Sequence, residues 1–113
     1  MHELSIAQSI VKSVEAEIER RGLRRVQRIV ARVGALSGVM PGSLVFGFDA
    51  IKADTLLATT ELVIEEVPAQ AHCRTCEREF TVSDLDFTCP QCSSRRVDVT
   101  QGHELEIAYL EID

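Results

Sequence analysis

The sequence contains no tryptophan, one tyrosine and four phenylalanines among its 113 residues. With so few aromatic side chains, a core must be built mainly from Val, Ile, Leu and Ala, which supply most of the 45% apolar fraction. No stretch approaches the roughly 18 to 20 consecutive apolar residues that span a bilayer, and the first residues carry neither the basic nor the apolar segment of a secretory signal. We therefore expect a cytoplasmic protein without a membrane segment.

Basic residues are also in short supply. Lys and Arg total 12 against 18 Asp and Glu, so the formal net charge is -6 and a polyanion would be repelled on average. Two local basic clusters exist, at residues 20–25 and 95–96, but the aromatic side chains that stack on bases are scarce. Nucleic acid is therefore not the expected partner.

The first twenty residues carry an amphipathic pattern. Apolar side chains recur at spacings of three and four residues from Leu4 to Ile18, which predicts a helix with one face toward a core. Gly22 can adopt a left-handed cap, and Arg20 and Arg21 suit the negative end of the helix dipole. We expect this helix to end near "RRG".

The stretch from Val26 to Leu36 alternates in character and predicts a strand. Pro41 suits the start of a second helix, and residues 59–67 and 103–112 predict two more strands. On strict alternation, one face of the first strand carries Ile29, Ala31, Val33 and Ala35, and the other carries Val26, Arg28, Val30 and Arg32.

A polar segment holding all four cysteines separates the last two predicted strands. Because this segment cannot form an apolar core of its own, the simplest topology pairs strands 59–67 and 103–112 with each other across an inserted module. The predicted fold class is α+β: a small three-stranded sheet with two helices, plus an inserted zinc-ribbon module. The first domain is then discontinuous, comprising residues 1–68 and 103–113, and the zinc-binding module comprises residues 69–102.

The cysteines form two Cys-x-x-Cys pairs, Cys73 with Cys76 and Cys89 with Cys92. Two intervening residues let one tight turn aim both sulfurs at a common point, and a hairpin can bring two such turns together as a tetrahedral four-sulfur site that suits Zn²⁺. Four thiolates leave no open position for water, so the site should be structural. A disulfide pair, a redox dithiol or an iron–sulfur cluster is the less favoured alternative.

The N-terminus is a second candidate metal site. The amine of Met1, the backbone and ring nitrogens of His2 and the amide nitrogen of Glu3 can close fused chelate rings around one ion. Four coplanar nitrogens suit Ni²⁺ or Cu²⁺ and suit Zn²⁺ poorly. These donors must lose protons to bind, so affinity should collapse on mild acidification. The Glu3 carboxylate is a substitute donor, or a charge that favours the helix N-terminus.

A simpler interpretation of the N-terminus also exists. Ser5 and Gln8 fit a capping box, in which case residues 1–4 only lead into the helix and His2 faces solvent.

Several motifs occur in a characteristic order: the fragments "MHE", "SIAQSIV", "VGALSGVMPGSLVFGFD" and "ELEIAYLEID", and the two cysteine pairs. With them, the sequence resembles the HypA/HybF family of hydrogenase nickel-incorporation proteins over essentially the whole chain. The resemblance implies a metallochaperone, with no catalytic residues, that helps deliver nickel to the large subunit of [NiFe] hydrogenase alongside a nickel-handling GTPase. It implies Ni²⁺ as transient cargo at Met1, His2 and Glu3, and structural Zn²⁺ at the four cysteines: Cys73, Cys76, Cys89 and Cys92.

Glycine often follows the second cysteine of a zinc turn, whereas this chain has Glu77 and Ser93. A monomer is the simplest state, with a weak homodimer as the other. The alternative function is a zinc-ribbon module for protein interaction or nucleic-acid binding, without a nickel role.

Overall fold

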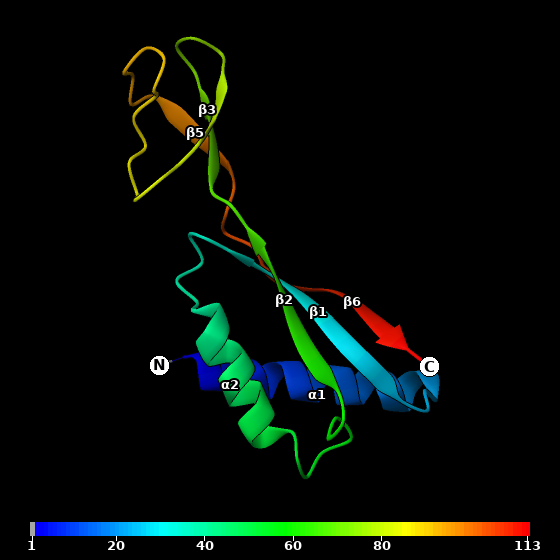
Figure 1. The fold of residues 1–113 in the computed structure, drawn as a ribbon. Coiled ribbons are helices and arrows are strands. Elements are labelled where there is room, and N and C mark those ends of the chain that lie inside the picture. Colours follow the sequence, from blue (N-terminus) through cyan, green and yellow to red (C-terminus); the bar gives the residue numbers. More distant parts are fainter. Residues whose placement is uncertain (1) are drawn as a thin grey trace.

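The computed structural model describes residues 2–113, so the predicted nickel ligand Met1 lies outside the described residues. The chain forms two three-stranded sheets that follow one another along an elongated molecule of 53 × 27 × 16 Å (Figure 1). The elements in chain order are α1 (Glu3–Arg21), β1 (Val26–Gly34), α2 (Pro41–Ile51), β2 (Glu61–Val67), β3 (Gln70–Cys73), β4 (Glu79–Thr81), β5 (Val97–Gln101) and β6 (Leu105–Ile112).

Helix α1 confirms the predicted amphipathic helix and its end. Gly22 has φ 64°, and the N–H of Leu23 donates to the carbonyl of Ile18 at 3.0 Å, which closes the helix with a left-handed cap. The helix begins at Glu3, so the capping-box interpretation is wrong and Ser5 lies inside the first turn. The early start has a packing reason, because the first turn of α1 packs against α2. At this contact, a Cβ added to Gly47 of α2 would lie 3.6 Å from the Leu4 side chain.

The first sheet has strand order β2-β1-β6 (Figure 1). The predicted three strands and two helices are confirmed, but the predicted pairing between strands 59–67 and 103–112 is wrong. Instead β1 is central: it pairs parallel to β2 through the α2 crossover and antiparallel to β6. The physical reason is that six of the nine residues of β1 are buried, and a strand buries its residues best between two neighbours.

Both helices cover one face of this sheet and form the main core with it (Figure 1). Strict alternation failed at two residues: Val26 is buried in this core and not on the opposite face, and Ala35, predicted on the core face, is exposed because β1 ends at Gly34. A register shift between Val26 and Arg28 interrupts the alternation, so the Val26 side chain lies on the core face. The largest fully buried apolar side chains of this core are Phe48, Ile29, Leu44, Leu57, Val14, Val26 and Val33.

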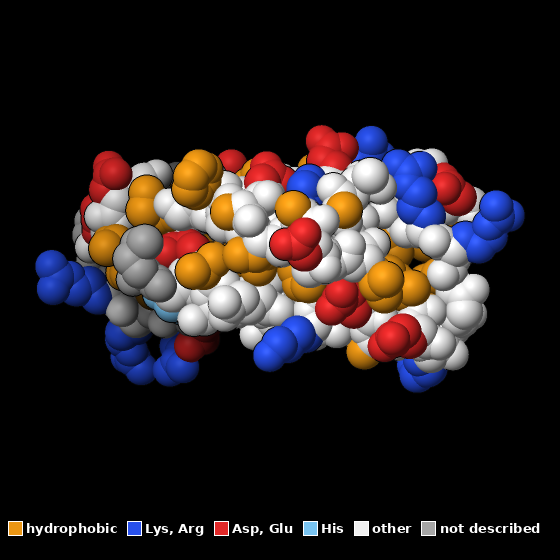
Figure 2. All heavy atoms as spheres, turned by 90° about the horizontal axis from the view of Figure 1, so that it is seen from below, with side chains coloured by type: hydrophobic (Ala, Val, Ile, Leu, Met, Phe, Trp, Pro, Cys, Tyr) orange, Lys and Arg blue, Asp and Glu red, His pale blue; other side chains and the backbone are white. Residues whose placement is uncertain are grey.

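The opposite face of the sheet is open to solvent and charged. Two arginines of β1 each reach a glutamate on both neighbouring strands, so ion pairs run across all three strands. On the helical side, Figure 2 shows hydrophobic side chains exposed between charged ones. The pairs are Arg28 with Glu61 and Glu111, and Arg32 with Glu65 and Glu106.

The second sheet, of order β4-β3-β5, continues from the ends of β2 and β6. At the junction, the N–H of Gly34 donates to the carbonyl of Glu104 at 2.8 Å, and the N–H of Leu36 donates to that of Gly102 at 2.7 Å. The Leu36 side chain packs against the small apolar cluster of the second sheet, so the loop after β1 touches both sheets. Within residues 2–113, neither helix has the length and apolar character needed to cross a membrane.

Candidate metal centres

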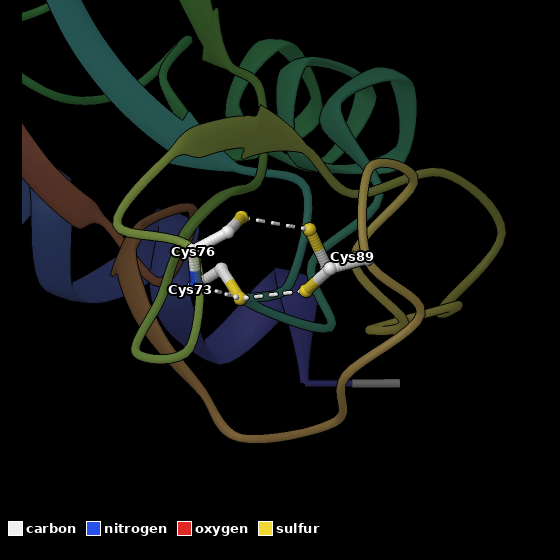
Figure 3. A group of neighbouring side chains, drawn as sticks. Cys73, Cys76 and Cys89 are labelled. Carbon is white, nitrogen blue, oxygen red and sulfur yellow. Dashed lines mark hydrogen bonds between the residues drawn. The ribbon is translucent and has the colours of Figure 1, made fainter.

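The four cysteine sulfurs converge between two loops of the second sheet. All four lie within 4.8 Å of one another, and Figure 3 shows the side chains of Cys73, Cys76 and Cys89 turned toward a common point. The Sγ atoms of Cys73 and Cys92 are 3.6 Å apart, as are those of Cys76 and Cys89. A tetrahedron with Zn–S bonds of about 2.3 Å needs sulfurs about 3.8 Å apart. The group therefore fits a tetrahedral zinc ion.

The two turns that present the sulfurs have the same backbone pattern. In each, the N–H of the residue after the second cysteine donates to the carbonyl of the first cysteine, at 2.9 Å for Glu77 and 2.8 Å for Ser93. Both residues are left-handed, with φ of 63° and 62°. The chain thus adopts a conformation that favours glycine at the two positions where zinc turns often carry glycine and this chain does not. The missing glycines do not prevent the turn geometry.

The thiols of the first turn differ in acidity. The backbone N–H groups of Cys76 and Thr75 stabilise the thiolate of Cys73 and lower its pKa to about 6. Burial and the neighbouring sulfurs raise the pKa of Cys76 to about 12. One sulfur is therefore ready to bind a cation as a thiolate, while its neighbour needs the positive charge of the metal to lose its proton.

His72 lies next to Cys73 but is not part of the four-sulfur group. Its Nδ1 atom is 2.5 Å from the Glu79 carboxylate and its Nε2 atom is 3.2 Å from that of Glu77. Hydrogen bonds to these two carboxylates raise the pKa of His72, and the bond to Glu79 has the larger effect. Both ring nitrogens are thus engaged by acidic side chains.

A strained hairpin tip lies between the two cysteine turns. Asp84 and Leu85 both have positive φ, 53° and 60°, and Ser83 bridges to Asp86 across them. This resembles a type I′ turn, which favours glycine, yet Leu85 is 71% exposed and gains little from packing.

Replacing Leu85 with glycine should raise the free energy of unfolding of the zinc-loaded protein by up to about 1 kcal/mol, because the left-handed strain of a leucine exceeds the entropic cost of glycine. Calorimetric unfolding measures the change. Leu56→Gly is the matched control: Leu56 is also exposed and is not left-handed, so the same substitution there should destabilise. A destabilised Leu85→Gly variant would show that the tip is not strained.

The second candidate centre is the start of α1. His2 is exposed and is the N-cap residue, and the first bond within the helix runs from the N–H of Ile6 to the His2 carbonyl at 3.0 Å. The amide nitrogen of Glu3 precedes this donor and has no acceptor in the preceding turn. The ring of His2 is therefore exposed at this end of the helix, beside an amide nitrogen, that of Glu3, which has no acceptor within the helix.

The Glu3 side chain has a task that the sequence did not reveal. The residue is only 7% exposed, and its carboxylate accepts the N–H of Met40 at 3.2 Å, at the start of α2. That N–H and its own backbone N–H lower the pKa of Glu3. Met40 is the N-cap of α2 and makes no side-chain cap, and Glu3 accepts its backbone N–H, as the glutamate of a capping box does. The one available hint was that Met40-Pro41 starts a helix without a capping side chain.

Sequence comparison identifies the family. The model of the family described as "Hydrogenase/urease nickel incorporation, metallochaperone, hypA" matches residues 1–112. The chain belongs to this HypA family. It is 43% identical over 114 residues to the Hydrogenase maturation factor HypA of Roseiflexus sp. (strain RS-1), covering 100% of this chain and 93% of that protein. It is 41% identical over 113 residues to the HypA of Geobacter metallireducens (strain ATCC 53774 / DSM 7210 / GS-15), covering both chains fully.

Solved HypA structures share the fold. The solution structure of the Ni metallochaperone HypA from Helicobacter pylori matches with a TM-score of 0.67 and 26% identity, covering 99% of this chain and 97% of that one. Another, titled "Solution structure of HypA protein", matches with a TM-score of 0.73 and 25% identity, covering 100% and 97%. The predicted resemblance and fold class are thereby confirmed.

Proposed function

We propose that this chain carries nickel: it binds Ni²⁺ as transient cargo through Met1, His2 and Glu3 and helps deliver the ion to the large subunit of [NiFe] hydrogenase. The observation that carries the proposal is the exposed His2 at the start of α1, beside an amide nitrogen with no helical acceptor. Membership in a family of nickel-incorporation metallochaperones supports it.

The exposure of this site suits a carrier. An ion held at a chain end can be reached by an acceptor protein, whereas a buried cage would release it slowly. Because the Glu3 carboxylate is engaged by Met40, we assign the third position to the Glu3 amide nitrogen in preference to its side chain. Planar nitrogen donors select Ni²⁺ over Zn²⁺ by geometry.

The four cysteines, Cys73, Cys76, Cys89 and Cys92, are proposed to hold a structural Zn²⁺. The fit of their sulfur separations to a tetrahedron supports this assignment. With every coordination position filled by sulfur, the zinc orders its loops and activates no water. In this proposal the protein is not an enzyme, acts in the cytoplasm, and works with a nickel-handling GTPase.

Two changes test the nickel site. Replacing His2 with alanine, or adding two residues before Met1, should reduce nickel affinity more than about 100-fold, because each change removes a ligand. Loss of a residue that only supports the ligands typically costs about 10- to 100-fold. Titration of the untagged protein with Ni²⁺, followed by the absorption of a planar d⁸ ion, measures the loss.

The matched control is His103→Ala, which removes an exposed histidine elsewhere and should leave nickel binding intact. Zinc content and circular dichroism should be the same in all four proteins. Stoichiometric nickel in the extended protein would mean that the terminal amine is not a ligand and would refute the proposed site.

A further inference from the structure

An open groove runs along β6, between this edge strand and α1. It begins as a cavity of about 360 Å³ lined by His2 at one end and continues as a cavity of about 490 Å³; Ser13 and Ile107 line both. In the described part of the chain, β6 pairs with β1 on one side only. The backbone of its other side is therefore free to pair with an added strand.

The walls of the groove are apolar on the strand side and small on the helix side. The β6 side chains opposite the core-facing residues of β1 are partly exposed, at 45% for Leu105 and 36% for Ile107. On α1, exposed serines recur every four residues along the groove and leave room for a partner's side chains. These serines are Ser5, Ser9 and Ser13.

The other face of β6 is acidic. Glu106 and Glu111 point to the open face of the sheet, where each shares its arginine with a second glutamate on β2. Two arginines therefore serve four glutamates, which leaves this ladder with an excess of negative charge. A strand added to β6 would place its own outward side chains next to Glu106 and Glu111, and basic side chains would complete the ion pairs.

The same charges argue against a second copy of this chain as the occupant. The strand reads Leu-Glu-Ile-Ala-Tyr-Leu-Glu-Ile, so two copies paired about a two-fold axis with apolar residues matched would set Glu106 of each opposite Glu111 of the other. Like charges directly opposite destabilise strand pairing. The formal charge of -6 on each chain adds to the repulsion.

We propose that the groove binds an extended segment of a partner protein as a fourth strand on β6, with apolar side chains facing α1 and Lys or Arg side chains facing Glu106 and Glu111. Since His2 lines one end of the groove, a bound segment brings its protein next to the N-terminus. The identification of that protein as one that exchanges nickel rests on the proposed function; strand binding itself does not.

The probe is an acetylated and amidated eight-residue peptide of alternating Val and Lys, added to the zinc-loaded protein without nickel and followed by amide NMR shifts. We expect shifts along β6 and the serine row of α1. A peptide of the same composition with Val and Lys in pairs keeps the charge and loses the alternation, and should bind about tenfold more weakly or worse. An alternating Val and Glu peptide should also bind at least about tenfold more weakly.

Variants locate the binding. Ile107→Ser removes an apolar contact in the groove. Ser9→Gln places a larger side chain in the groove and leaves α1 intact, because glutamine is a good helix former, so this variant stays informative even if Ile107→Ser perturbs β6. Each should weaken the alternating Val and Lys peptide several-fold, whereas Leu56→Ser, at an exposed leucine outside the groove, should not.

Three results would overturn the proposal: shifts outside the groove, equal binding of the paired and alternating peptides, or unchanged binding in Ser9→Gln. Self-association of the wild-type protein through β6, seen as concentration-dependent sedimentation with new amide protection on that strand, would assign the edge to a second copy instead. Peptide binding is measured without nickel and nickel binding is measured without peptide, so failure of the nickel site and failure of the groove can be told apart.

Discussion

Replacing Gly34 with alanine is expected to destabilise the protein by about 3 kcal/mol or more, because the new methyl group has no place at the junction of the sheets. A Cβ on Gly34 would lie 2.0 Å from the carbonyl oxygen of Gly102 and 2.8 Å from the backbone nitrogen of Glu104. These neighbours are backbone atoms that hydrogen-bond to the same loop, so they cannot move without breaking the junction. Chemical denaturation of the zinc-loaded protein measures the change.

Gly42 supplies the matched control. It lies in the first turn of α2, and a Cβ there meets nothing within 4 Å. Alanine at this position should leave the protein as stable or raise its stability by up to about 1 kcal/mol through helix propensity. If Gly34→Ala and Gly42→Ala unfold at the same denaturant concentration, the close approach at the junction does not exist in solution.

The helices and the cysteine turns could be predicted because their determinants are local. The three- and four-residue spacing of apolar side chains, the glycine at position 22 and the proline at position 41 each act within a few residues, and each element formed where they indicated. Likewise, Cys-x-x-Cys spacing determines the turn that brings two sulfurs together. The convergence of both pairs then required only a hairpin.

The strand order could not be predicted from local patterns, since pairing depends on which strands bury each other. One signal pointed to the correct answer: the charged face of the segment from Val26 to Gly34 carries an apolar residue, Val30, between its two arginines, and this residue is buried. The predicted strands 59–67 and 103–112 each carry glutamates on the open face, as expected of strands that each take half of a shared ion-pair ladder.

The contact between Glu3 and Met40 was also beyond local reasoning, because it joins residues 37 positions apart. Its effect on the candidate site is direct. This side chain, a substitute nickel donor on the sequence alone, instead accepts the N–H of the N-cap residue of α2, so the start of α1 is held against the second helix.

Removing zinc should unfold the cysteine module, residues 69–102, and leave the first sheet folded. The apolar cluster of the module has only three buried members, Ala69, Ala71 and Val82, with four partly buried side chains packed against them. Ordering a backbone costs about 1 to 2 kcal/mol per residue, which so small a cluster cannot offset over the length of the module. Metal binding by thiolates must supply the difference, and structural zinc contributes about 10 to 16 kcal/mol in comparable small folds.

The measurement is amide hydrogen exchange after chelation, or in Cys73→Ser, with zinc content determined in parallel. Strands β3 and β5 should lose protection, while α1 and β1, which belong to the larger core, should keep theirs. His72→Ala is the control, because His72 bonds to carboxylates and lies outside the sulfur group, so this variant should retain one zinc ion.

The pattern of exchange also tests the predicted division into residues 1–68 with 103–113 and residues 69–102. Leu36 is the sensitive point, since it belongs to the first segment but packs on the cluster of the second. Loss of protection that stops at the bonds between Gly34 and Glu104 would establish two independent units joined by Leu36. Loss that spreads through β1 would mean that zinc stabilises the whole chain, and persistence of β3 and β5 without metal would rule out a structural role for the site.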